Sequence, residues 1–226
     1  MSGGEMTSTV LITGANRGVG LALAQHYHRE GWQVIGVCRS ASAELADVAE
    51  RVIEGIDVTR EADVAGLAEA LDGTRLDLLI NNAGLLRDEQ LGEIDFDTIR
   101  EQMEINAYAP LRVAEALLGC LGEGSKIANI TSRMGSIADN DSGGRYGYRA
   151  SKAALNAFGK SLAVDLAPRG IAVAQLHPGY VQTRMVNFGG LISPDEAAAG
   201  IAARIEALSL ETSGGFWHSN GEPLPW

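Results

Sequence analysis

Short runs of apolar residues alternate along this chain with longer stretches whose apolar positions recur at a helical period. The short runs are rich in β-branched residues and lack strict polar alternation, which is typical of strands buried on both faces. The pattern predicts strands over residues 9–13, 33–38, 52–56, 76–80, 126–130 and 171–176, and helices over residues 18–30, 61–71, 97–118, 146–166 and 194–208. Because strands and helices alternate, we expect right-handed βαβ crossovers. The fold class is therefore predicted as α/β: a single-domain, Rossmann-type, doubly wound parallel sheet with helices on both faces.

The domain organisation is predicted to be simple. The chain contains no internal repeat, no linker rich in proline, glycine or serine, and no block of like charge. We therefore expect one domain over residues 1–226, with residues 1–7 as a loose N-terminal extension.

The net charge and the number of cysteines indicate which binding partners and which cellular compartment to expect. The 226 residues include 29 Asp and Glu against 18 Lys and Arg, a formal net charge of −11. A surface of this sign repels phosphate backbones, so we expect no nucleic-acid partner. The two cysteines, Cys38 and Cys120, are too few for a disulfide scaffold, and no apolar run approaches the length of a membrane span. The N-terminus also lacks the basic and apolar segments of a signal peptide, so we expect a cytoplasmic protein with no membrane partner.

A glycine-rich turn joins the first predicted strand to the first predicted helix, with the sequence Thr13-Gly14-Ala15-Asn16-Arg17-Gly18-Val19-Gly20. Glycines in this position allow a tight turn and let backbone N–H groups and the helix N-terminus approach a pyrophosphate. We therefore expect a dinucleotide to be bound by Gly14, Asn16, Arg17, Gly18, Val19 and Gly20. A strand-to-helix connection without a ligand remains the alternative.

The end of the second predicted strand bears on the choice of cofactor. NAD-binding sheets usually place a carboxylate there to bind the adenine ribose, whereas this chain has Arg39. Arg39 and Arg17 could hold a 2′-phosphate through bidentate contacts, so NADP(H) is preferred over NAD(H). The alternative is a solvated arginine on a loop.

Tyr148 and Lys152 are four residues apart in the predicted helix over residues 146–166, so both side chains lie on one helical face. A free tyrosine ionises near pH ~10, which makes it a poor acid or base at neutral pH. A neighbouring lysine favours the phenolate and lowers its pKa toward the working range. The pair therefore indicates acid–base chemistry.

With these motifs in place, the chain resembles the short-chain dehydrogenase/reductase family over nearly its whole length. The marks of the family follow in order: the turn over residues 13–20, Asp57-Val58, Asn81-Asn82-Ala83-Gly84, Asn106, Thr131-Ser132, Tyr148 to Lys152, and Pro178-Gly179 with Thr183. Residues 132–137 and 146–152 are most similar to the compact carbonyl-reductase branch, which includes sniffer-type reductases and bacterial C-factor-like proteins.

The resemblance implies an NADP(H)-dependent oxidoreductase that moves a hydride between nicotinamide and a carbonyl or alcohol substrate. Tyr148 would be the general acid or base, and Lys152 would lower its pKa and bind the nicotinamide ribose. Ser132 would bind the substrate oxygen, and Asn106 would hold a water in a proton relay to Lys152. The remaining implied cofactor contacts are Asp57 and Val58 at the adenine, Asn82, Ala83 and Gly84 at the adenosine ribose, and Pro178, Gly179, Val181 and Thr183 at the nicotinamide.

Several alternatives stay open. The interval from Ser132 to Tyr148 is longer than is usual in the family, which makes Ser136 a competitor for the substrate oxygen. Asn81 and Asn82 could only tie the centre of the sheet to its loop, with a structural role favoured most for Asn81. Pro178 and Gly179 could form a strand-ending turn, and Asp57 could be a helix N-cap. The short segment between Thr183 and Pro194 implies an open substrate site and leaves the substrate undetermined.

The spacing of His26, His28, His177 and His218 makes no metal site, so none is expected. The resemblance implies a homodimer or homotetramer, since relatives in the family assemble in these ways, with a monomer as the alternative because some compact reductases are monomers. The alternative function is a C-factor-like, dinucleotide-binding signalling or regulatory protein with incidental turnover.

Overall fold

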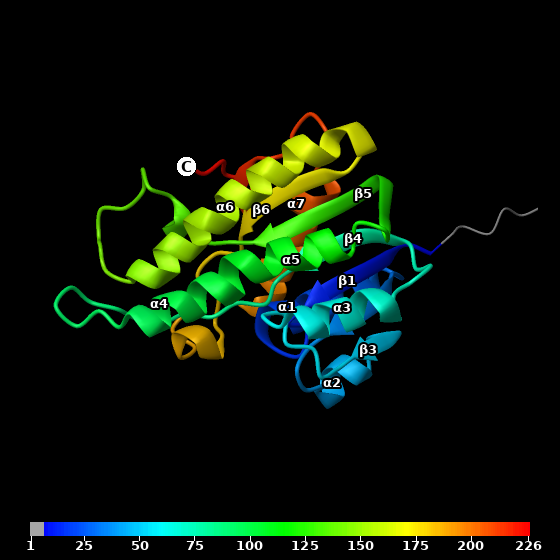
Figure 1. Ribbon diagram of the computed structural model, residues 1–226, viewed down its shortest axis with the longest axis horizontal. Coiled ribbons are helices and arrows are strands. Elements are labelled where there is room, and N and C mark those ends of the chain that lie inside the picture. The colour runs from blue at the N-terminus through cyan, green and yellow to red at the C-terminus, as the bar shows by residue number, and fades with distance from the viewer. Residues whose placement is uncertain (1–6) are drawn as a thin grey trace, which may run out of the picture.

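The computed structural model describes residues 7–226, which form one seven-stranded sheet in the order β3-β2-β1-β4-β5-β6-β7 (Figure 1). The strands, all parallel, are β1 (Thr9–Thr13), β2 (Gln33–Val37), β3 (Arg51–Ile53), β4 (Leu76–Asn81), β5 (Leu121–Ile130), β6 (Ala172–His177) and β7 (Phe216–His218). The α-helices are α1 (Gly18–Arg29), α2 (Ala43–Ala46), α3 (Glu61–Ala70), α4 (Phe96–Met103), α5 (Ala109–Ala116), α6 (Tyr146–Leu166) and α7 (Pro194–Glu206). The predicted N-terminal extension lies outside the described residues apart from Thr7.

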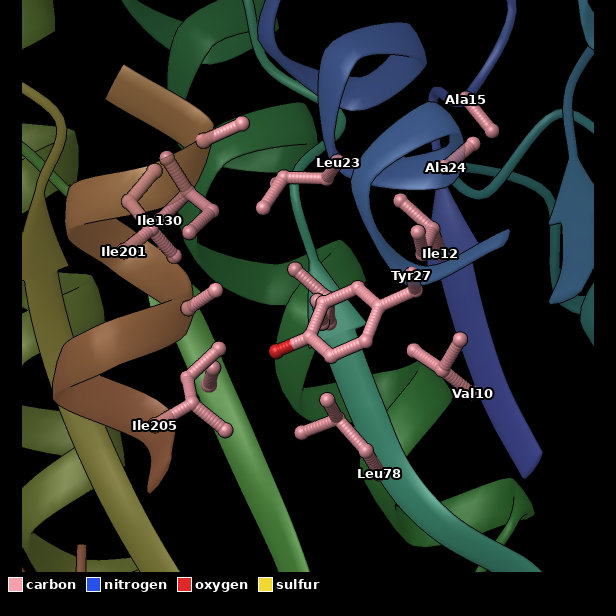
Figure 2. Close-up of a cluster of buried hydrophobic side chains, with 14 of the residues drawn as sticks. Val10, Ile12, Ala15, Leu23, Ala24, Tyr27, Leu78, Ile130, Ile201 and Ile205 are labelled. Carbon is pink, nitrogen blue, oxygen red and sulfur yellow. The ribbon is translucent and has the colours of Figure 1, made fainter. Parts of the chain in front are cut away.

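Helices cover both faces of the sheet, as predicted. Along β1, Val10 and Ile12 point into a core shared with α1 and α7, while Leu11 points into a second core shared with α3, α5 and α6. Figure 2 shows the first core, where the ring of Tyr27 lies between β1 and α7. The doubly wound parallel sheet is therefore confirmed. None of the helices in the described part of the chain combines the length and apolar character needed to cross a bilayer.

Some element boundaries differ from the prediction. The segment expected to form one helix over residues 97–118 instead forms α4, a π-helix over Glu104–Tyr108, and α5. The sequence predicted a single helix because the apolar period runs through the π-helical turns without a break. The strand expected over residues 52–56 is the shorter edge strand β3, which pairs with β2 alone. The pattern missed α2 and β7, which are too short to show a period.

The chain reverses its direction of strand addition between β1 and β4, which are neighbours at the centre of the sheet. In such sheets, ligands bind outside the carboxyl ends of the strands at this switch point. The glycine-rich turn follows β1, and residues 82–84 follow β4. The first candidate residues therefore meet at the crevice where a dinucleotide binds in folds of this class.

Candidate active site

The glycine-rich turn closes tightly against the ends of β2 and β4. Gly14 and Gly18 have φ values of +66° and +56°, which side-chain-bearing residues rarely adopt. The Gly14 N–H donates to the Val37 carbonyl at 2.8 Å. A Cβ atom at Gly20 would collide with the Gly14 carbonyl oxygen and the Asn82 amide. The glycines are therefore required by the turn itself.

The N-terminus of α1 has the features of an anion site. Arg17 is the N-cap residue, but its side chain makes no capping hydrogen bond, and the first turn of this 12-residue helix contains no acidic residue. The first backbone N–H groups of a helix have no partner within the helix, and they carry the positive end of its dipole. These groups fit the pyrophosphate of a dinucleotide.

The loop after β2 lies beside this turn. Asn16 Nδ2 donates to the Ser40 carbonyl oxygen at 2.9 Å, which ties the turn to the loop that holds Arg39. Arg17 and Arg39 are exposed, and within residues 7–226 neither guanidinium forms an ion pair or hydrogen bond. Both are thus available to a phosphate group.

Asp57 follows β3 and faces the same loop. Burial alone would raise the pKa of its carboxyl, but two hydrogen bonds from Thr59 and the charges of Arg39 and Arg60 outweigh burial and lower it. Helix α3 begins only at Glu61, with Arg60 as its N-cap residue. Asp57 is therefore not the N-cap, and its carboxylate lies close enough to Arg39 to feel its charge. Val58 beside it is buried.

Residues 82–84 brace the turn from β4. Asn82 Nδ2 donates to the carbonyl oxygens of Thr13 and Gly14 at 3.0 and 3.2 Å, and Thr13 Oγ1 accepts from the N–H groups of Asn82 and Ala83. The Asn82 side chain therefore holds the turn in place.

The acid–base candidates lie at the carboxyl end of β5. Ser132 lies two residues beyond the end of β5, and its hydroxyl is close enough to Tyr148, at the start of α6, to act on the pKa of the phenol. Burial raises the pKa of Tyr148, while the nearby Ser132 hydroxyl and the charge of Arg145 act in the opposite direction. The lowered pKa expected from the tyrosine–lysine pair is thus not seen here, because burial outweighs the opposing groups. At neutral pH the phenol keeps its proton.

Lys152 and Asn106 lie beneath this tyrosine. The Lys152 ammonium donates to the Ile130 carbonyl oxygen at 2.9 Å and lies 5.8 Å from the centre of the Tyr148 ring. Burial lowers the pKa of Lys152 to about 8. A Cβ atom at Gly84 would lie 3.2 Å from Asn106 Oδ1 and 3.6 Å from Lys152 Nζ, so these groups share one small space.

The Asn106 side chain is fully engaged with the protein. Its Oδ1 accepts from Leu85 N–H at 2.7 Å, and its Nδ2 donates to the Leu85 carbonyl oxygen at 2.7 Å and to Ser151 Oγ at 3.0 Å. The side-chain amide therefore braces the segment after β4 against α6. Asn106 also lies in the π-helix, a local irregularity that is frequent at functional sites.

The two serine candidates have different surroundings. Ser136 Oγ donates to the Trp226 carbonyl oxygen at 3.0 Å and accepts from Asp139 N–H at 3.0 Å, so it fastens the loop to the C-terminal segment. Ser132 Oγ accepts from Met134 N–H at 3.2 Å and contacts Tyr148. The structure brings Ser132, and not Ser136, to the tyrosine.

The sequence and fold of this chain are similar to those of known proteins. A family model described as short chain dehydrogenase matches residues 8–189. This chain belongs to the short-chain dehydrogenase/reductase family. A 1-hydroxy-2-glutathionyl-2-methyl-3-butene dehydrogenase of Rhodococcus sp. strain AD45 is 43% identical over 225 residues, 97% of this chain and 100% of the relative.

Two further matches place the chain within the family. The C-signal protein of Myxococcus xanthus is 42% identical over 154 residues, 67% of this chain and 93% of the relative. The crystal structure of an NADPH-bound carbonyl reductase from chicken fatty liver superimposes with a TM-score of 0.87 at 30% identity, covering 97% of this chain and 99% of that one. The predicted resemblance to C-factor-like and carbonyl-reductase members of this dehydrogenase/reductase family is confirmed.

The segment after β6 contains the last of the residues expected to contact the cofactor. Gly179 has a φ of +96°, and the Pro178 carbonyl oxygen accepts from Ser219 Oγ at 3.0 Å. Val181 is buried, and Thr183 lies against the glycine-rich turn, since a Cβ atom at Gly18 would be 3.4 Å from its methyl group. Segments far apart in sequence thus meet on both sides of the crevice.

Sequence reasoning missed a carboxylate that supports the start of α6. Glu89 is 3% exposed, and its Oε2 accepts from Gly147 N–H at 3.1 Å. Its Oε1 accepts from Thr98 Oγ1 at 2.8 Å and from Gln102 Nε2. The carboxylate thus caps the helix that carries Tyr148. Nothing in the polar sequence around Glu89 distinguishes it from a solvated loop residue.

Sequence reasoning also missed a row of hydrogen-bonded amide side chains that links three strands beneath α6. Asn81 Nδ2 donates to Asn129 Oδ1 at 3.0 Å, and Asn129 Nδ2 donates to Gln175 Oε1 at 2.9 Å, linking β4, β5 and β6. Asn81 thus has the structural role that was its alternative interpretation. No group of histidine, cysteine or carboxylate side chains within residues 7–226 is arranged to hold a metal ion.

Proposed function

We propose that this protein is an NADP(H)-dependent oxidoreductase that interconverts a carbonyl compound and its alcohol, with Tyr148 as the general acid or base. The observation that carries the proposal is the cluster of Tyr148, Lys152 and Ser132 beyond the carboxyl end of β5, where the Lys152 ammonium lies 5.8 Å from the Tyr148 ring and the Ser132 hydroxyl acts on the pKa of the phenol. Family membership supports oxidoreductase activity, and the NADPH-bound neighbour supports a nicotinamide dinucleotide as the cofactor.

The cofactor would be held by groups that fit its chemistry. The N–H groups at the start of α1 suit the pyrophosphate, and Arg17 and Arg39 suit a 2′-phosphate. The adenine would lie near Asp57 and Val58, the adenosine ribose along residues 82–84, and the nicotinamide along Pro178, Gly179, Val181 and Thr183. Bound NADPH would supply the hydride.

The side chains of the site would manage the proton and the oxygen of the substrate. Reduction of C=O to CH–OH requires a hydride at carbon and a proton at oxygen. Tyr148, whose raised pKa keeps it protonated, would donate that proton, and Ser132 would stabilise the developing negative charge on oxygen. The Lys152 ammonium would favour the phenolate that remains. Asn106, whose side chain braces the neighbouring backbone, would hold a water in a proton relay to Lys152.

The decisive experiment follows the loss of NADPH absorbance during incubation with aldehydes, ketones and quinones. The panel includes carbonyl compounds with a glutathione thioether, because the name of the Rhodococcus relative describes a glutathionyl alcohol. We expect turnover of at least one member. Tight NADPH binding without turnover of any member would instead favour the signalling or regulatory function suggested by the name of the Myxococcus relative.

The proposal also includes the setting of the reaction. Both cysteines are free, which suits a reducing cytoplasm. A homodimer or homotetramer stays a prediction of the family resemblance, and light scattering of the purified protein measures it.

A further inference from the structure

A cavity of about 490 Å³ opens beside the start of α6, within the range of roughly 300–1,000 Å³ typical of small-molecule sites. Its walls come from the loop before α4, the loop before α6 and the first turn of α6, which lie at the same end of the molecule (Figure 1). The residues used below are Asp88, Leu91, Met134, Arg145, Tyr146 and Arg149. None of these residues belongs to the proposed cofactor contacts.

The cavity adjoins the reacting groups. Met134, which lines it, donates its backbone N–H to Ser132 Oγ at 3.2 Å. Arg145 Nη1 lies 3.9 Å from Met134 Sδ, and the charge of Arg145 acts on Tyr148. A substrate whose oxygen contacts Ser132 and Tyr148 can therefore extend its remaining atoms into this cavity.

The charges in the wall are unbalanced. Arg145 Nε pairs with Asp88 Oδ1 at 3.4 Å, which leaves Arg149 as the second cation. Arg149 Nε donates to the Gly143 carbonyl oxygen at 3.3 Å, and Nη2 donates to Ser142 Oγ at 2.8 Å. These neutral partners fix the orientation of the guanidinium but leave its charge uncompensated. No carboxylate within residues 7–226 forms an ion pair with it.

The wall therefore carries two arginines and one aspartate, a local excess of one positive charge in a chain whose net charge is −11. Such an excess matches a monoanion better than a dianionic phosphate, because Asp88 competes for one of the two guanidinium groups. Leu91, Met134 and Tyr146 add apolar surface to the same cavity. Arg145 also has a left-handed φ of 49°, a conformation that is costly for arginine and that recurs at functional sites.

We propose that this cavity is a substrate subsite, in which Arg149, assisted by Arg145, binds a carboxylate on an apolar arm of the carbonyl or alcohol substrate. The inference rests on the proposed oxidoreductase function and adds the substrate class, which is carbonyl compounds that carry a carboxylate. Arg149 is then a specificity-determining residue, since it contacts the arm and not the reacting oxygen.

The test compares matched pairs of substrates, for example 4-carboxybenzaldehyde and its neutral methyl ester, together with aliphatic oxo-acids of increasing length and their esters. We expect kcat/KM for the acid to exceed that for the ester by roughly tenfold or more, as for one charge-assisted hydrogen-bonded contact. Arg149→Met should reduce this ratio to about one through a higher KM for the acid, with the ester changed by less than about twofold.

Two further variants sharpen the test. Arg87→Met removes a cation from the same loop that pairs with Glu101 at 3.1 Å and does not line the cavity, so the acid-to-ester ratio should not change. Asp88→Asn frees Arg145, so the ratio should rise. An unchanged ratio in Arg149→Met, an equal loss in Arg87→Met, or a preference for the ester in the wild type would overturn the subsite.

Failure of the proposed function is distinguishable from failure of the subsite. If no carbonyl compound is turned over, the oxidoreductase proposal fails. Calorimetric titration of the acid and the ester into the NADP-loaded protein then still measures the subsite directly. Stronger binding of the acid that is lost in Arg149→Met supports it, and equal binding of acid and ester overturns it.

Discussion

At the scale of single residues, Tyr148 is 8% exposed, and burial is the main cause of its raised pKa. We predict that Tyr148→Phe lowers turnover by at least about a hundredfold, because the variant cannot donate the proton that the product oxygen requires. Binding of NADPH, measured by fluorescence titration, should stay within a few-fold of the wild type. Near-normal turnover by the variant would assign the acid to another group.

Ser132 and Ser136 provide an internal comparison. Ser132→Ala removes the hydroxyl beside Tyr148 and should lower kcat by roughly a hundredfold, as for loss of an oxyanion donor. Ser136→Ala should change kcat much less, because its hydroxyl binds the Trp226 carbonyl oxygen and the Asp139 N–H. The effect of Ser136→Ala should instead be seen in the midpoint of thermal unfolding. The reverse ranking of kcat values would contradict the arrangement of this loop.

The sequence predicted individual site residues where local spacing determines proximity. Tyr148 and Lys152 share a face of α6 because they are one helical turn apart, and the apolar run over residues 126–130 places Ser132 just beyond the carboxyl end of a strand. Glu89 could not be found in this way, since only tertiary packing buries its carboxylate against Gly147. A tying role for Asn82 could be weighed from the sequence, but its partners could not be identified, because they belong to a turn 68 residues away along the chain.

At the scale of elements, the meeting of the glycine-rich turn with the end of β2 controls cofactor choice. Arg39 is exposed at this junction, where the neighbouring Ser40 carbonyl oxygen accepts from Asn16 of the glycine-rich turn. Loss of one charge-assisted contact with a 2′-phosphate typically costs about 1.5–3 kcal/mol, which is roughly a ten- to hundredfold loss of affinity. We therefore predict that Arg39→Asp weakens NADPH binding by this factor and leaves NADH binding unchanged or improved.

The control for this prediction is Arg29→Asp, which makes the same charge change at an exposed residue near the end of α1. It should leave the ratio of the two dissociation constants unaltered. Added salt should weaken NADPH binding more than NADH binding, because the distinguishing contact is ionic and lies at the surface. Equal dissociation constants for NADPH and NADH in the wild type would exclude the preference.

Elements with a long, uninterrupted period were the most predictable from sequence. Helix α6 extends over Tyr146–Leu166, the range expected from its pattern and from the breakers Pro168 and Gly170. The π-helix around Asn106 was not predictable, because a single shift of the backbone hydrogen bonds leaves the apolar pattern nearly intact. Strand β7 contains only Phe216–His218, and its pairing with β6 forms through tertiary contacts.

At the scale of the whole molecule, stability should depend on pH through a histidine at the end of β6. Burial lowers the pKa of His177 to about 3, and the charges of His218, Arg133 and Lys152 add to this effect. The His177 ring packs edge-on against His218 at 4.8 Å between centroids. The folded protein therefore keeps His177 neutral in a range where an unfolded chain, with a histidine pKa of about 6.5, takes up a proton.

Proton uptake by His177 in the unfolded state determines how the free energy of unfolding changes with pH. Between about pH 6.5 and pH 3 the unfolded state binds more protons at this residue, so the free energy of unfolding falls as the pH falls through this range. The slope from one group is at most about 1.4 kcal/mol per pH unit. His177→Gln keeps a polar side chain but removes the titration. We therefore predict that, below about pH 6.5, the free energy of unfolding measured with urea falls more steeply with falling pH in the wild type than in His177→Gln.

The measurement is the difference between the two proteins, because carboxylates such as Asp57, whose pKa is lowered, titrate in both and cancel. His218→Gln is the matched control, since burial and the charge of Arg133 lower the pKa of His218 as well, while Glu222 acts in the opposite direction. Its profile should lie between those of the wild type and His177→Gln. Parallel profiles for the wild type and His177→Gln between about pH 7 and pH 5 would show that the buried ring does not couple folding to protonation.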